Sequence, residues 1–291
     1  MRLLLSFAAL LVASGCGPST SAPAPAPLTV MTYNVMCSFC AETGMDDWAT
    51  RLPHLEAAIT RHKPDLLGLE ELLTQDDLDP FLASFPEYTA VYFVDPDPGN
   101  DKAPFPIYPD ATIFFRTSRF TEVNHGSYWL SPTPDTPWSE GFAPHVQLWR
   151  LVTWVELVDK PSGQHLFFAA THFDNNAPSQ AKSAPLVLAR TAPWAKKMPV
   201  IFVGDFNSTP ATTAYATLAT AFKNSYDLAT TPRIDTDQSP APEWDPTQRI
   251  DHIWTAGHAF HVTDWAVDIH LYGEPPRPPS DHFPVVAQLA W

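Results

Sequence analysis

Short apolar runs rich in β-branched and aromatic residues recur along the chain and limit the folds available to it. Buried strands are predicted for ten of these runs, at Leu28–Asn34, Asp65–Leu69, Tyr88–Val94, Ala111–Arg116, Leu151–Val158, His165–Thr171, Pro199–Phe206, Ile250–Trp254, Val262–Ile269 and Pro284–Leu289. Helical patterns are fewer and lie at Asp46–His62, Ser179–Trp194 and Ala211–Phe222. Proline-rich segments at 95–109, 131–144 and 231–246 predict long surface loops. Many strands with a few helices between them predict an α/β protein built from two packed sheets flanked by helices.

Polar side chains stand where six of these apolar segments end or begin. The groups are Tyr33-Asn34, Glu70-Glu71, Thr171-His172-Phe173-Asp174, Gly204-Asp205-Phe206-Asn207, Arg249-Ile250-Asp251-His252 and Ser280-Asp281-His282-Phe283-Pro284. A single asparagine or aspartate at such a position is usually a turn or a cap. Six groups at strand ends instead predict a common rim on which carboxylates, amides and imidazoles converge. Such a rim suits a hard divalent cation and an anionic substrate.

The composition excludes several classes of protein. A hydrophobic content of 45% among 291 residues is ordinary for a globular chain and excludes wholesale disorder. The chain has 11 glycines and neither a Gly-x-x-x-x-Gly-Lys nor a Gly-x-Gly-x-x-Gly pattern, which argues against a nucleotide-cradling loop. A net charge of −15 gives no support for a protein that coats nucleic acid, and it fits either a bound cation or simple solubility.

The first residues have the pattern of an export signal. Met1 and Arg2 precede an apolar stretch that is too short to span a bilayer permanently, and the small residues before Cys16 resemble a bacterial lipobox. We therefore expect a signal peptide over residues 1–15, lipidation of Cys16, a Pro/Ala/Ser-rich linker over 16–27 and a single domain over 28–291. The expected location is the bacterial cell envelope, at the outer membrane or in the periplasm. Ordinary cleavage followed by secretion is the alternative.

Cysteine usage fits an oxidising compartment. Once Cys16 is assigned to a lipid, Cys37 and Cys40 remain, separated by two residues. We expect this pair to close a small disulfide loop, because two cysteines cannot form a structural zinc site alone. A thiol redox role is the alternative, although no thioredoxin-like βαβ pattern surrounds the pair.

The polar groups, in their order along the chain, resemble the motifs of the endonuclease/exonuclease/phosphatase superfamily. The matching segments are YN (33–34), GLEE (68–71), THFD (171–174), GDFN (204–207), RIDHI (249–253) and SDHFPV (280–285). GDFN followed by a terminal SDH-x-P is highly specific, and residues 111–157 are similar to a secreted bacterial branch of the superfamily. The resemblance covers nearly all of the chain after the linker. It implies a four-layer α-β-β-α sandwich of two mixed sheets with a DNase-I-like fold, a site at one edge of the sheets, and Mg²⁺-dependent cleavage of a phosphoester.

The resemblance also implies how a cation is held. Glu71 is the expected main Mg²⁺ ligand, with Asn34 beside it and Asp281 as a second carboxylate. Mn²⁺ and Ca²⁺ are the alternative ions. The sequence departs from the superfamily at Glu70, where glutamine commonly stands. This extra carboxylate would either enlarge the metal site or weaken phosphate binding.

Five further residues receive catalytic roles by the same resemblance. Asp205 would orient or deprotonate the attacking water, and Asn207 would donate to a non-bridging phosphoryl oxygen. His282 would contact the phosphate and transfer a proton, with its tautomer set by Asp251. His172 would be a second imidazole at the phosphate.

Simpler interpretations accompany some of these residues. Asn207 is also placed for an Asx turn, and Asp251 is also placed to pair with Arg249. Arg150 would either reach the phosphate as a substrate-binding residue or brace the sheet. His252 stands where the superfamily often has an aromatic residue, so we expect it to be a packing residue.

These inferences predict an exported Mg²⁺-dependent phosphoesterase that hydrolyses a phosphodiester or a phosphomonoester as a monomer, held at a membrane by its lipid anchor. Duplex DNA would require cationic grooves, which a net charge of −15 does not favour. A small phosphodiester or a phosphorylated head group is therefore expected at least as readily as nucleic acid. The alternatives are a nuclease acting on extracellular DNA or RNA, and a catalytically silent surface-binding lipoprotein on the same scaffold.

Overall fold

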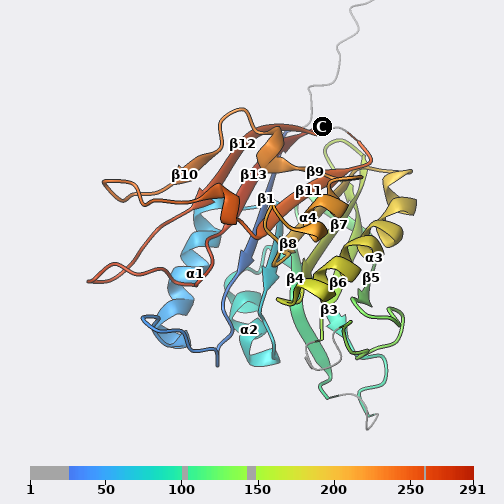
Figure 1. The fold of residues 1–291 in the computed structure, drawn as a ribbon, viewed down its shortest axis with the longest axis horizontal. Coiled ribbons are helices and arrows are strands. Elements are labelled where there is room, and N and C mark those ends of the chain that lie inside the picture. Colours follow the sequence, from blue (N-terminus) through green and yellow to red (C-terminus); the bar gives the residue numbers. More distant parts are fainter. Residues whose placement is uncertain (1–25, 100–103, 143–148, 259) are drawn as a thin grey trace, which may run out of the picture.

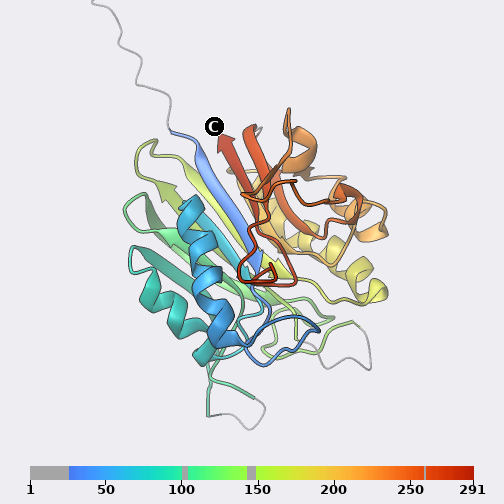
Figure 2. The same ribbon diagram turned by 90° about the vertical axis from the view of Figure 1, so that its left-hand side faces the viewer.

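Two mixed β-sheets lie face to face, and helices cover their outer sides (Figure 1). The computed structural model describes residues 26–99, 104–142, 149–258 and 260–291. The expected signal peptide, Cys16 and the linker up to residue 25 lie outside these ranges. Figure 2 shows the layers edge-on, with the blue and teal helices on the left, the yellow helix on the right and the strands between them. The predicted four-layer α-β-β-α sandwich is confirmed.

The seven-stranded sheet has the order β10-β12-β13-β1-β2-β4-β3. Its strands are β1 (Leu28–Asn34), β2 (Leu66–Glu70), β3 (Tyr88–Val94), β4 (Ile107–Arg116), β10 (Arg233–Asp235), β12 (His261–Asp268) and β13 (Val285–Ala290). At its centre, β1 runs parallel to β2 and antiparallel to β13, and β2 runs antiparallel to β4.

The six-stranded sheet has the order β5-β6-β7-β8-β11-β9. Its strands are β5 (Phe120–Trp129), β6 (Leu151–Asp159), β7 (His165–His172), β8 (Val200–Asp205), β9 (Lys223–Asn224) and β11 (Asp251–Ala256). Here β7 runs parallel to β8, and β8 runs antiparallel to β11. The helices are α1 (Trp48–His62), α2 (Gln75–Ser84), α3 (Ala177–Ala195), α4 (Thr213–Leu218), α5 (Ser225–Leu228) and a short 3₁₀ turn at Pro246–Gln248. In the described part of the chain, no helix combines the length and the apolarity needed to cross a membrane.

Alternation along the strands sorts the apolar side chains into layers. In β1, Leu28 and Val30 belong to the core between the two sheets, whereas Met31 and Tyr33 pack toward α1 and α2. On the other side, the outer face of the six-stranded sheet packs against α3 and α4, as Phe202 does. Each sheet packs against the other sheet on one face and against helices on the other. Its central strands are therefore buried on both faces and appear in the sequence as continuous apolar runs.

The sequence patterns missed the short elements β9, α5, β10 and the 3₁₀ turn, and they also missed two longer ones. The first is α2, which contains Pro80 and several acidic residues and so lacks a clear apolar stripe. Its signal was local, since Thr74 and Asp77 form a capping box at its start. The second is β5, whose middle residues are exposed, so that it has no apolar run. The expected loops over 95–109 and 231–246 are also partly wrong, because β4 already begins at Ile107 and the second segment contains β10.

Glycine is required where β7 and β8 run side by side at Gly204. The φ of Gly204 is +145°, and a Cβ at this position would overlap the carbonyl oxygen of Thr171 on β7. The next residue is Asp205, the last residue of β8. The close strand contact therefore determines where the Asp205 carboxylate is delivered.

We expect Gly204→Ala to lower the free energy of unfolding by more than about 1 kcal/mol, because alanine is strained at this φ and meets backbone. Urea unfolding at neutral pH measures the change. The matched control is Gly99→Ala, since a Cβ there has no neighbour within 4 Å. Equal stability of the two variants would contradict this account of the strand contact.

Candidate active site

The polar strand ends meet at one edge of the paired sheets. Parallel pairing of β1 with β2 and of β7 with β8 brings their carboxyl ends, with Asn34, Glu71, His172 and Asp205, to this edge. The strands β11 and β13 run antiparallel to their neighbours, so their amino ends reach the same place. In the register of the six-stranded sheet, Asp205 is paired with both His172 and Asp251. The topology thus assembles the predicted rim.

The Asp205 carboxylate lies between two imidazoles. Its Oδ2 is 3.4 Å from Nε2 of His172 and 3.7 Å from Nε2 of His282. A second carboxylate stands behind each ring: Nδ1 of His172 is 3.2 Å from Asp110, and Nδ1 of His282 is 2.9 Å from Asp251. These carboxylates orient the rings so that both Nε2 atoms face Asp205. The centre of the site is therefore one aspartate flanked by two Asp–His pairs.

The ring of His282 is poised to hold a proton. Burial lowers the pKa of His282, but the charge and hydrogen bond of Asp251, together with the charge of Asp205, outweigh burial and leave that pKa well above 6.5. His282 is therefore protonated at neutral pH and can donate from Nε2. Asp251 does not contact Arg249, whose guanidinium instead pairs with Asp227.

Asp110 is a buried member of the site that the sequence patterns did not identify. Its carboxylate accepts from the backbone N–H of Glu71 at 2.9 Å and from Nη1 of Arg150 at 3.0 Å. Burial raises the pKa of Asp110, but His172 and Arg150 together lower it to about 2. Nη1 of Arg150 is also 2.6 Å from Nδ1 of His172; because a guanidinium only donates and a carboxylate only accepts, the contacts of this Nδ1 with Arg150 and with Asp110 are alternatives set by the tautomer of the ring. The only signal for Asp110 was an aspartate directly before the predicted strand Ala111–Arg116, and the structure places it inside β4.

Glu71 and Asn34 offer the oxygen-rich surroundings that a hard cation needs. Oε1 of Glu71 accepts from Nδ2 of Asn34 at 3.1 Å, and Nδ2 lies 3.2 Å from Oδ2 of Asp205. The amide of Asn34 therefore bridges two carboxylates, while its Oδ1 accepts the N–H of Met36 at 3.0 Å. The Glu71 carboxylate is a ligand of the kind that Mg²⁺ prefers and fits the expected ion, whereas Asn34 presents its Nδ2 to the carboxylates and orients them.

Asp281 lies beside His282 at the exposed rim of the site. Its side chain is exposed, and its Oδ1 is 3.3 Å from Oγ of Ser280. In the described part of the chain, two groups of residues each place three atoms of metal-ligand type within 4.8 Å of one another. The first group is Asp205, Asp251 and His282, and the second is Cys37, Cys40 and Glu71. Asp281 belongs to neither group and instead shares a pocket with Asp251 and His282.

Asn207 lies beside Asp205 in a tight turn. Its backbone N–H donates to Oδ1 of Asp205 at 2.8 Å, and its Nδ2 donates to the carbonyl oxygen of Phe173 at 2.9 Å. The φ angles of Asn207, Glu71 and Ala111 are +47°, +69° and +60°, values that are costly for residues with side chains. Backbone strain of this kind is concentrated at functional sites, where the surrounding structure enforces it.

Glu70 points between the sheets beneath the site. Its carboxyl oxygens lie 3.1 and 3.2 Å from Oγ1 of Thr32. Burial, and then the charges of Asp251 and Asp205, raise the pKa of Glu70 well above 4.5, which favours the protonated acid. A protonated glutamic acid has the shape and neutrality of glutamine. Glu70 therefore differs less from the glutamine of the superfamily than the sequence indicates.

His252 is buried behind the site and packs as expected. Its Nε2 donates to the carbonyl oxygen of Ser208 at 2.9 Å, and its Nδ1 lies 3.1 Å from Nδ2 of Asn224. Both ring nitrogens have partners that suit a neutral imidazole. Burial lowers the pKa of His252 to about 3, so the ring stays uncharged in the folded protein.

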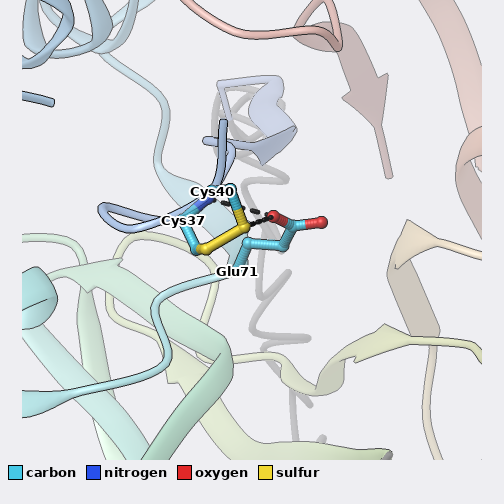
Figure 3. Close-up of side chains that lie close together, drawn as sticks. All are labelled: Cys37, Cys40 and Glu71. Atoms are coloured by element: carbon cyan, nitrogen blue, oxygen red, sulfur yellow. Dashed lines mark hydrogen bonds between the residues drawn. A yellow bond between two sulfur atoms is a disulfide. The ribbon is translucent and has the colours of Figure 1, made fainter. Parts of the chain in front are cut away.

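A disulfide joins Cys37 and Cys40 directly against Glu71 (Figure 3). Oε2 of Glu71 accepts the backbone N–H of Cys37 at 3.0 Å and lies 3.8 Å from Sγ of Cys40. The small loop predicted from the spacing of the two cysteines thus borders the expected cation ligand.

We expect Asp110→Asn to lower the free energy of unfolding by about 3 kcal/mol, because Arg150 would remain buried without its carboxylate. Urea unfolding at pH 7 measures the loss. The control is Asp264→Asn, which breaks an exposed pair with Arg233 and should cost less than about 1 kcal/mol. Similar losses in the two variants would show that Asp110 does not hold the site together.

The neutral ring of His252 makes stability depend on pH. The unfolded chain binds a proton at this histidine below about pH 6.5, whereas the folded chain does so only near pH 3, so stability falls as the pH is lowered through this window. Because His252→Gln lacks this proton, its free energy of unfolding relative to that of wild type should be about 2 kcal/mol more favourable at pH 5 than at pH 7. Urea unfolding at both pH values tests this. His261→Gln, at an exposed position, should show no such gain.

The chain is similar to a known family and to several solved structures. The sequence profile of the endonuclease/exonuclease/phosphatase family matches residues 31–282. No curated protein matches the chain significantly. A mannosyl-6-phosphatase of Bacteroides thetaiotaomicron is 30% identical and has a TM-score of 0.76, covering 91% of this chain and 100% of that one. An endonuclease/exonuclease/phosphatase family protein of the same organism is 29% identical and has a TM-score of 0.75, covering 92% and 98%. The catalytic domain of human Nocturnin is 22% identical with a TM-score of 0.64, covers 91% and 93%, and shares the fold.

Proposed function

The chain belongs to the endonuclease/exonuclease/phosphatase family, and from this premise we propose that it is a Mg²⁺-dependent hydrolase of a small phosphate ester. The observation that carries the proposal is the position of Asp205 between two imidazoles, each backed by a carboxylate. Water attack on phosphorus requires a proton acceptor for the water, a proton donor for the product oxygens and neutralisation of the phosphate charge. The edge of the sheets offers all three within one cluster.

The residues that would hold the cation are Glu71 and Asn34, with Asp281 as a second carboxylate. A bound Mg²⁺ would neutralise charge on the phosphate and polarise its oxygens. The donor set supports this assignment because carboxylate oxygens are ligands of hard cations, and the amide of Asn34 orients the carboxylate of Glu71. Mn²⁺ would suit the same ligands.

The proton steps are assigned to the chain's own side chains. Asp205 takes the proton of the attacking water, while the N–H of Asn207 and the amide of Asn34 hold its carboxylate in place. Protonated His282 donates from Nε2 to the phosphate, and Asp251 keeps the charged ring oriented. His172 faces the phosphate from the other side of Asp205. Asn207 is proposed to stabilise charge on a non-bridging oxygen.

Pairing of the nearby arginines supports a small substrate over a long nucleic acid. Arg150 is engaged by Asp110, and Arg249 is engaged by Asp227 and by the hydroxyl of Tyr215. The flanking phosphates of a polynucleotide would need cations of their own, since such contacts supply most of its non-specific affinity. A substrate with a single phosphate group needs only the cation and the imidazoles.

A pocket beside His282 offers room for the organic part of such a substrate. It has a volume of about 210 Å³, is open to solvent, and is lined by Trp244, Gln248 and Phe283 as well as His282. An aromatic face beside an amide suits a ring that carries hydroxyl groups. The similarity to a mannosyl-6-phosphatase makes a sugar phosphate the first substrate to test.

Export and membrane anchoring remain part of the proposal. The amino-terminal pattern supports an export signal with lipidation at Cys16. The Cys37–Cys40 disulfide supports an oxidising compartment, because structural disulfides persist there. We propose a monomeric enzyme held outside the cytoplasm by its lipid and linker.

Asp205→Asn should lower kcat by about 10²- to 10⁴-fold, because asparagine cannot accept the proton. The nearly isosteric amide should leave the free energy of unfolding within about 1 kcal/mol of wild type. Steady-state kinetics with Mg²⁺ and urea unfolding measure the two effects. Asp264→Asn serves as the control and should keep wild-type kcat.

The substrate class is tested by giving wild type and Asp205→Asn the same panel with Mg²⁺ and with EDTA. The panel consists of mannose 6-phosphate, bis(p-nitrophenyl) phosphate, sphingomyelin and plasmid DNA. Mg²⁺-dependent release of inorganic phosphate from the sugar phosphate would support the proposal. Preferential cleavage of plasmid DNA would favour a nuclease, and the absence of both hydrolysis and Mg²⁺ binding would favour a silent binding protein.

A further inference from the structure

The disulfide loop Cys37-Ser38-Phe39-Cys40 follows β1 and contacts the expected cation ligand. Figure 3 shows the disulfide lying against the carboxylate of Glu71. Oε2 of Glu71 accepts the Cys37 N–H at 3.0 Å, while Oε1 accepts from Asn34 at 3.1 Å. Two independent donors, one per oxygen, thus set the orientation of this carboxylate. One of the two belongs to the disulfide loop.

The loop is anchored to the body of the protein at its Cys37 end, and a backbone hydrogen bond from the Cys40 N–H to the carbonyl oxygen of Cys37, at 3.2 Å, closes it. The buried guanidinium of Arg51 donates to the carbonyl oxygens of Val35, Met36 and Cys37 at 2.8 to 3.2 Å. Cys37 is fully buried, whereas Phe39 is 67% exposed and Cys40 is also exposed. The disulfide is therefore the covalent tie that holds the exposed half of the loop against the anchored half.

The oxidation state of Cys40 changes the chemistry at Glu71. In the disulfide, Sγ of Cys40 carries no proton, so its contact with Oε2 at 3.8 Å is a close approach without donation. A dithiol would attack the exposed Cys40 sulfur, the bond to Cys37 would break, and ring closure of the reductant would leave two protein thiols and one cyclic disulfide. A Cys40 thiol could then donate to Oε2 and compete with a cation for that oxygen.

We propose that the Cys37–Cys40 disulfide is a positioning element for Glu71, so that the affinity of the site for a divalent cation depends on oxidation of this pair. The inference rests on the proposed function insofar as Glu71 is taken to hold the cation. Partners that orient a metal ligand typically change metal affinity 10- to 100-fold when they are removed. An enzyme of this kind binds its cation weakly while its cysteines are thiols and acquires full affinity once they are oxidised.

The test compares four forms of the full-length protein: oxidised wild type, wild type reduced with dithiothreitol, Cys40→Ser and Ser38→Ala. Isothermal titration with Mn²⁺ measures cation affinity, and amide hydrogen exchange of the metal-free protein reports on the Cys37 N–H. We expect reduced wild type and Cys40→Ser to bind Mn²⁺ about tenfold more weakly and to exchange the Cys37 N–H faster. Ser38→Ala keeps the disulfide and should match oxidised wild type in both measurements.

Reversibility separates positioning from a general loss of structure. Reoxidation should restore the affinity of wild type and leave Cys40→Ser unchanged, and the far-ultraviolet circular dichroism of all four forms should coincide. Equal Mn²⁺ affinity and equal exchange in oxidised and reduced wild type would overturn the inference even if phosphoester hydrolysis is found. A redox-dependent affinity without hydrolysis of any phosphoester would instead leave it standing and contradict the proposed function.

Discussion

Crowding of acidic side chains at one edge of the paired sheets is the constraint on which the rest of the site depends. The acids gathered there are Glu70, Glu71, Asp110, Asp205 and Asp251. Like charges at such distances disfavour joint ionisation, and burial makes the cost larger. The chain offsets this repulsion with two imidazoles, one arginine and one bridging amide, and burial raises the pKa of Glu70. A bound cation would complete the same compensation.

The groups that offset the repulsion also orient the side chains of the site. Asp110 and Asp251 hold the two histidines so that both face Asp205, and Arg150 secures Asp110 from behind. Each member depends on a neighbour from a different strand. A site built in this way is rigid because its electrostatic balance fails when any one member moves.

Much of the fold was readable from the sequence because the central strands are buried on both faces. Such strands appear as apolar runs, and all ten predicted runs correspond to strands. The same reasoning could not find β5, whose exposed middle carries no apolar pattern, or α2, whose start is marked only by the Thr74 capping box. Asp110 was missed for a related reason: it stands between the predicted loop and the predicted strand, and it has no visible partner until β4 is placed beside β2.

Patterns among neighbouring residues identified the candidate site residues. Polar groups at strand ends, a signal-like start and a Cys-x-x-Cys pair are all patterns of this kind. Only the tertiary structure decided which of them meet. Strand direction and register paired Asp205 with His172 and Asp251, the sheet-to-sheet contact brought Asn34 to Asp205, and the disulfide loop was laid against Glu71. It also decided protonation, because burial and the charges of neighbours hold a proton on His282 and favour one on Glu70. Charge interactions depend on distance and burial, and neither quantity exists until the sheets have packed.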